Sequence, residues 1–128
     1  MKLGLLGTIL LLTACGSSTL HGSVTLTTGD GLTRSGNACS GSGGYADLTA
    51  GAPVTIKNES GAIIATGTLD AGVSDSIYPT VVCHFTYTIS NIPTAKFYMV
   101  EVSHRGALTY SQEQLDANGW KSDVTIGS

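Results

Sequence analysis

One stretch decides the fold of this chain: CHFTYTIS, at residues 83–90. Apolar and polar side chains alternate along it, with Cys83, Phe85, Tyr87 and Ile89 on one side and polar residues between them. A period of two residues is the pattern of a β-strand that buries one face, whereas a helix repeats every 3.6 residues. The stretch therefore predicts a half-buried strand in a sheet that is covered on one side.

Other strands are predicted on both sides of this stretch. VTIK at residues 54–57 and AIIATGTL at residues 62–69 flank the turn sequence NESG and predict a β-hairpin. SQEQ at residues 111–114 has the spacing of a capping box and predicts one helical turn, ended by Asn118 and Gly119. Further strands are expected at residues 23–27, 97–102, 108–110 and 120–126.

Together these elements predict an all-β fold. About seven short strands, with one short helical turn, are typical of a single β-sandwich. The segment 29–44 is rich in Gly, Ser and Asn and has no periodicity, so we expect a long surface loop there.

The N-terminal end has the features of an export signal. Lys2 precedes an apolar run at residues 3–12, which is shorter than the roughly 20 residues of a transmembrane helix. LTAC at residues 12–15 then closely resembles the lipobox of bacterial lipoproteins. The resemblance implies that Cys15 is acylated and becomes the new N-terminus, with membrane lipid as its partner. A plain secretion signal with an incidental cysteine is the alternative.

This interpretation divides the chain into three parts. Residues 1–14 are expected to be a lipoprotein signal peptide, residues 15–22 a lipidated tether, and residues 23–128 the β-sandwich domain. The expected location is exported, with the lipid anchor in the outer face of the cytoplasmic membrane.

If Cys15 is lipidated, Cys39 and Cys83 remain as a pair in an oxidising compartment, where a disulfide is the default. Two free thiols in the core, or half of a metal site, are the alternatives. A disulfide is favoured because no second Cys or His lies at ligand spacing around either residue. We expect the bond to clamp the Gly- and Ser-rich loop onto the central strand.

Charge and motifs argue against several functions. A formal net charge of −3 with six Lys and Arg residues gives no electrostatic footprint for nucleic acid. His21, His84 and His104 have no metal-ligating neighbour at zinc spacing, and no Gly-x-Ser-x-Gly nucleophile motif is present. We therefore expect no enzyme activity and no catalytic, cofactor-binding or metal-binding residues.

The central block also resembles a known module. PVTIKNESGAIIATGTLDAG at residues 53–72, followed by FTYTISNIP at 85–93 and FYMVEV at 97–102, looks like a prealbumin-like sandwich. Such modules occur in carboxypeptidase regulatory domains and in repeats of collagen-binding adhesins. The resemblance implies a prealbumin-like or immunoglobulin-like sandwich, but not an activity. The whole mature chain, with GGYADL at 43–48 and VSHRG at 102–106, also looks like small exported proteins of actinobacteria and their phages.

Two functions follow as expectations. The first is a membrane-anchored surface lipoprotein that serves as a non-enzymatic binding or structural module, with a protein partner in the cell envelope. The alternative is a phage- or prophage-encoded superinfection-exclusion lipoprotein, which blocks genome injection at the cell surface.

Overall fold

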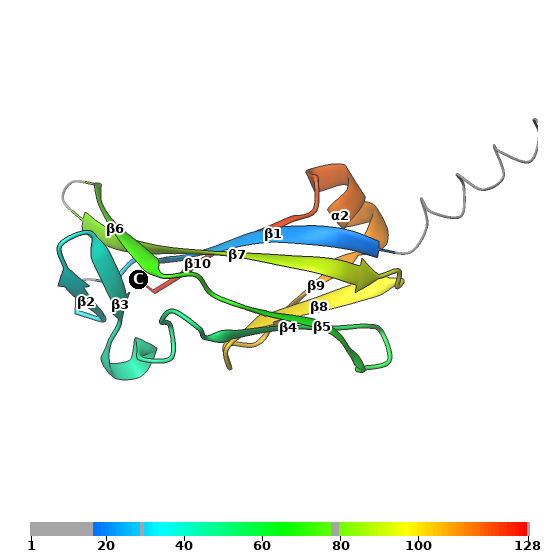
Figure 1. Ribbon diagram of the computed structural model, residues 1–128, viewed down its shortest axis with the longest axis horizontal. Helices are drawn as coiled ribbons and strands as arrows, with labels where there is room; N and C mark the ends of the chain where they lie inside the picture. Colours follow the sequence, from blue (N-terminus) through cyan, green and yellow to red (C-terminus); the bar gives the residue numbers. More distant parts are fainter. Residues whose placement is uncertain (1–16, 29, 78–79, 128) are drawn as a thin grey trace, which may run out of the picture.

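The computed structural model of the protein describes residues 17–28, 30–77 and 80–127. Within these ranges, ten strands form two sheets that pack face to face, accompanied by a short 3-10 helix and one α-helix (Figure 1). The predicted all-β sandwich is thereby confirmed. The predicted signal peptide and Cys15 lie outside the described residues. Within the described ranges, no helix has the length and apolar character needed to cross a membrane.

The first sheet has six strands in the order β10-β1-β7-β6-β3-β2. Their bounds are Ser17–Leu26 (β1), Leu32–Ser35 (β2), Ala38–Gly41 (β3), Gly72–Ile77 (β6), Thr80–Pro93 (β7) and Lys121–Ile126 (β10). The pair formed by β1 and β10 is parallel, and the other pairs of this sheet are antiparallel.

The second sheet has four antiparallel strands in the order β5-β4-β8-β9. Their bounds are Pro53–Lys57 (β4), Ile63–Thr68 (β5), Phe97–Val102 (β8) and Ala107–Ser111 (β9). The helix α2, Gln112–Asn118, follows β9 and leads into β10, so it connects one sheet to the other.

The core lies between the two sheets, and β7 contributes its centre. The alternation predicted for residues 83–90 is confirmed, because Cys83, Phe85, Tyr87 and Ile89 are all buried. Opposite them, the second sheet supplies Val54, Ile56, Tyr98, Val100 and Val102. β7 runs from Thr80 to Pro93 and is therefore longer than the alternating stretch at 83–90. Its first part pairs with β6, and its later part pairs with β1.

The local predictions around turns are also confirmed. β4 and β5 form the expected antiparallel hairpin, with the Asn58 side chain accepting hydrogen bonds from the backbone of Ser60 and Ala62. At the start of α2, Ser111 and Gln114 make both bonds of a capping box. Gly119 ends the helix in the left-handed conformation, with φ of 80°.

Two predicted segments are corrected. The expected loop at 29–44 contains β2, β3 and a 3-10 helix at Gly43–Tyr45. Most residues of β2 and β3 are exposed or half-buried, so the two strands leave no apolar alternation in the sequence. Together with β6, which is also absent from the sequence prediction, they raise the strand count from about seven to ten.

Most of the segment 15–22, expected to be a tether, forms part of a strand. β1 begins at Ser17 and pairs with the end of β7, so residues 17–22 belong to the sheet. Gly22 takes a buried position in this part of the strand, and a glycine carries no apolar signal.

Candidate functional site

The sandwich has a groove where two edge strands from different sheets lie on the same side. β10 is at one edge of the six-stranded sheet, and β9 is at one edge of the four-stranded sheet. Both strands start or end at α2 and run away from it in separate layers (Figure 1). The gap between these edges is the candidate functional site.

The groove has a volume of about 410 Å³ and mostly apolar walls. One wall comes from β8 and β9 through Val100, Val102 and Leu108, and the other from β10 through Val124 and Ile126. Leu108 is 43% exposed, so part of the wall faces solvent. This volume lies within the usual range of small-ligand sites, roughly 300–1,000 Å³.

Tyr87 and Ser122 place hydroxyl groups in the floor of the groove. The Tyr110 hydroxyl on β9 and Ser122 Oγ on β10 lie 2.8 Å apart and hydrogen-bond across the two edges. Tyr87 reaches the same floor from β7. Burial raises the pKa of the Tyr87 phenol, and its interaction with Ser122 only partly opposes this effect. The floor can therefore donate or accept hydrogen bonds while it remains neutral.

The position of Tyr87 depends on a glycine in the neighbouring strand. Gly22 of β1 is paired with Tyr87 in the sheet register. A Cβ atom at Gly22 would lie 1.9 Å from Cζ of Tyr87, closer than any real contact. The absence of a side chain at Gly22 thus lets the ring occupy this space.

Arg105 stands at the rim of the groove and is held by residues distant in sequence. Its guanidinium donates two hydrogen bonds to the Asp47 carboxylate and one, of 2.7 Å, to the Gly44 carbonyl. It also lies 4.9 Å from the centre of the Tyr45 ring. The hydrogen bond from Arg105 is the largest cause that lowers the pKa of Asp47. The arginine therefore acts as a fixed part of the rim.

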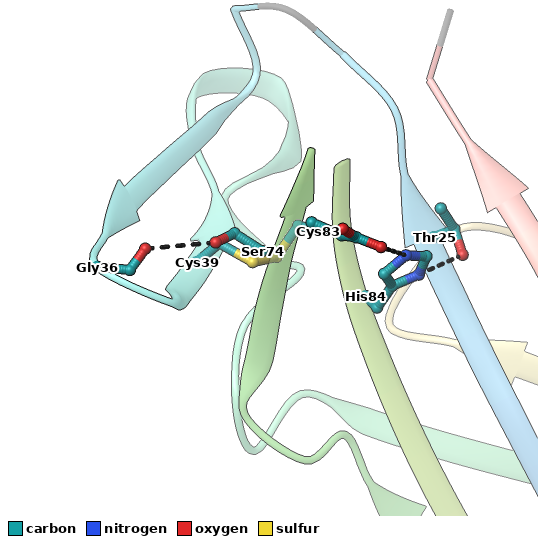
Figure 2. Close-up of a disulfide and its surroundings, with 7 residues drawn as sticks. Thr25, Gly36, Cys39, Ser74, Cys83 and His84 are labelled. Carbon is teal, nitrogen blue, oxygen red and sulfur yellow. Dashed lines mark hydrogen bonds and ion pairs between the residues drawn. A yellow bond between two sulfur atoms is a disulfide. The ribbon is translucent and has the colours of Figure 1, made fainter. Parts of the chain in front are cut away.

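The predicted disulfide is present and joins Cys39 on β3 to Cys83 on β7, with their Cα atoms 5.9 Å apart (Figure 2). β6 lies between these strands in the sheet order. The bond passes close to Gly72 of β6, where a Cβ would lie 2.4 Å from the Cys39 carbonyl oxygen and 2.7 Å from Cys83 Sγ. Glycine at this position leaves the room that the crossing needs.

The three histidines are not brought together. His84 lies on the outer face beside the disulfide, with Nδ1 3.0 Å from Thr25 Oγ1 and Nε2 3.9 Å from an Asp75 carboxylate oxygen (Figure 2). The second distance is too long for a hydrogen bond. His84 and its two neighbours do not line the groove. His21 lies on β1 and His104 lies in the turn before β9, and neither lines the groove. Among residues 17–28, 30–77 and 80–127, no three His, Cys, Asp or Glu residues are grouped to hold a metal.

The groove has no signature in the sequence. Trp120, at the start of the region 120–126, packs edge-to-face against Tyr98, with ring centres 5.1 Å apart. The alternation in residues 120–126 does show that Ser122, Val124 and Ile126 share one face. No local signal, however, shows that this face meets β9.

Comparison with known proteins adds no relative. No family model, curated protein or solved structure matches this chain. The groove and the N-terminal motif are the two features of this chain that bear on its function.

Proposed function

We propose that this protein is a membrane-anchored surface lipoprotein whose β-sandwich is a non-enzymatic binding module of the cell envelope. The LTAC motif at residues 12–15 supports the anchor and the exported location. The observation that carries the binding role is the apolar groove between the edges of β9 and β10.

The groove suits an extended segment of a partner protein. Edge strands present backbone N–H and C=O groups on the side where no strand of their own sheet lies, and an added strand can pair with them. β9 carries no charged residue that would oppose such pairing. Apolar side chains of the partner would enter between Leu108 and Val124, and polar ones would reach the hydroxyls of the floor.

Photo-crosslinking in living cells tests the binding role. A photoreactive amino acid replaces Leu108 in the groove, or Thr66, which is exposed on β5, as the matched control. We expect position 108 to form a defined adduct with an envelope protein, and position 66 to form none. A Val124→Glu change should remove the adduct because it places a charge in the apolar wall. Identical adducts from both positions, or none from position 108, would contradict the proposal.

Palmitate labelling tests the anchor separately. The wild-type chain should incorporate the label, and the Cys15→Ala variant should not. Equal labelling of the two proteins would overturn the proposed acylation of Cys15.

A superinfection-exclusion role is the second candidate. The observation that favours it is the short distance along the chain from Cys15 to β1, since only Gly16 lies between Cys15 and Ser17. So short a connection would hold the module at the membrane surface. At least one phage would then form fewer plaques on cells that express the wild-type chain than on cells that express Cys15→Ala. Unchanged plating across a broad phage panel would count against this role.

A further inference from the structure

Several segments meet at the end of the sandwich where β1 begins. Ser17 pairs with Pro93 at the end of β7, and the connection from β7 to β8 follows directly. The turn between β4 and β5 lies at the same end, as does α2 (Figure 1). The Glu59 side chain fastens the turn to the connection by accepting hydrogen bonds from the backbone N–H groups of Lys96 and Phe97.

Two large apolar side chains are exposed near this end. Ile63 at the start of β5 is 61% exposed, and Phe97 at the start of β8 is 45% exposed. Lys57 lies between their strands, since it is paired with Ile63 on one side and with Met99 on the other. We call Lys57, Ile63, Lys96 and Phe97 the β5–β8 rim.

The charged residues of the rim itself are lysines. Lys57 and Lys96 belong to the rim, and the nearby Glu59 carboxylate is occupied by two backbone N–H groups. The acidic residues of α2, Glu113 and Asp116, follow β9, which is the edge of the sheet opposite β5. The far end carries both signs of charge, since Arg34 lies on β2 and Asp75 on β6 (Figure 1).

The position of Cys15 limits how far this end can be from the membrane. Only Gly16 separates Cys15 from Ser17, and two residues of extended chain span about 7 Å. We infer that the β5–β8 rim rests on the lipid bilayer that holds the anchor, with Ile63 and Phe97 in the headgroup region and the two lysines facing anionic lipid. This inference rests on the proposed anchor at Cys15.

A short tether to the membrane compensates for the weak affinity of the rim for lipid. Two apolar side chains and two lysines are too few to hold a free domain on a membrane. A short tether, however, raises their effective concentration at the surface. The bound rim would fix the orientation of the sandwich and thereby present the groove and the β2–β3 end at defined heights above the lipid.

Tryptophan quenching by brominated lipid tests the orientation. Full-length protein purified from bacterial membranes is placed in vesicles of equal parts phosphatidylcholine and phosphatidylglycerol, with and without brominated acyl chains. Phe97→Trp and Ile63→Trp report on the rim, and Val73→Trp is the matched control, because Val73 is 55% exposed on β6. Emission of the parent protein, which contains Trp120, is subtracted.

Side chains bound at the interface reach the boundary between headgroups and acyl chains, so we expect about twofold stronger quenching at positions 97 and 63 than at position 73. Equal quenching at all three positions would overturn the inference, whatever the state of the anchor. Palmitate labelling of the same preparations measures acylation of Cys15 independently. Absence of acylation is thereby distinguished from an orientation other than the one proposed. Two reporter positions keep the test valid if one variant does not fold.

Discussion

The ring of Tyr87 occupies the space that a side chain at Gly22 would fill, although the two residues belong to different strands. This relationship sets the floor of the groove. It also explains why a glycine stands at a buried position of β1.

Gly22→Ala should therefore destabilise the protein. Its Cβ would lie 1.9 Å from the Tyr87 ring, so the ring or the strand must move. Overpacking of this kind costs about 1–3 kcal/mol in the free energy of unfolding, which denaturant titration measures. Gly44→Ala is the control, because no atom lies within 4 Å of its added Cβ and its φ is not positive. Equal stability of the two variants would refute this account.

Tyr87 should also make the stability of the protein fall at high pH. Burial raises its pKa above the ordinary value of about 10, so the folded chain keeps a proton that the unfolded chain loses. The free energy of unfolding should then decrease as the pH rises above about 10. Tyr87→Phe should weaken this decrease, whereas Tyr45→Phe should leave it in place. Identical pH profiles for wild type and Tyr87→Phe would contradict the prediction.

The disulfide should be fully formed and should stabilise the fold. Its ends are 44 residues apart, for which the chain-entropy model gives an upper value of about 4 kcal/mol. Cys39→Ala/Cys83→Ala should lose up to this amount in thermal or denaturant unfolding. In the Cys15→Ala chain, which retains only these two cysteines, native alkylation followed by intact-mass measurement should find no free thiol. Two alkylated cysteines in oxidised protein would refute the bond.

The Asp47–Arg105 pair should contribute a small, pH-dependent stabilisation. Both side chains are partly exposed, so we expect Asp47→Asn to cost less than about 1 kcal/mol at neutral pH. Hydrogen bonding to Arg105 lowers the pKa of Asp47 from its usual 3.8. The cost of the substitution should therefore be complete above that pH and vanish as the pH falls through the lowered pKa. Asp30→Asn, which removes an exposed carboxylate, is the control; an equal pH-dependent cost there would argue against a specific pair.

The parts of the fold that depend on residues close together in the sequence could be predicted from the sequence. The alternation at 83–90, the hairpin around Asn58 and the capping box at Ser111 and Gln114 are all present in the structure. Their determinants are side-chain periodicity and hydrogen bonds that span two to four residues. β2, β3 and β6 escaped prediction because exposed and glycine-containing strands carry no apolar alternation.

The sequence alone determined that half-buried strands form a sandwich, because burial of every second side chain is written in the order of the residues. It also indicated which two cysteines pair, because the lipobox resemblance assigns Cys15 to lipid and leaves Cys39 and Cys83. Only the tertiary structure decided that β9 and β10 face each other across an open groove, and that Arg105 meets Asp47, 58 residues away. Such contacts depend on which strand edges come together when the two sheets pack, and that is set by the whole core rather than by any local stretch.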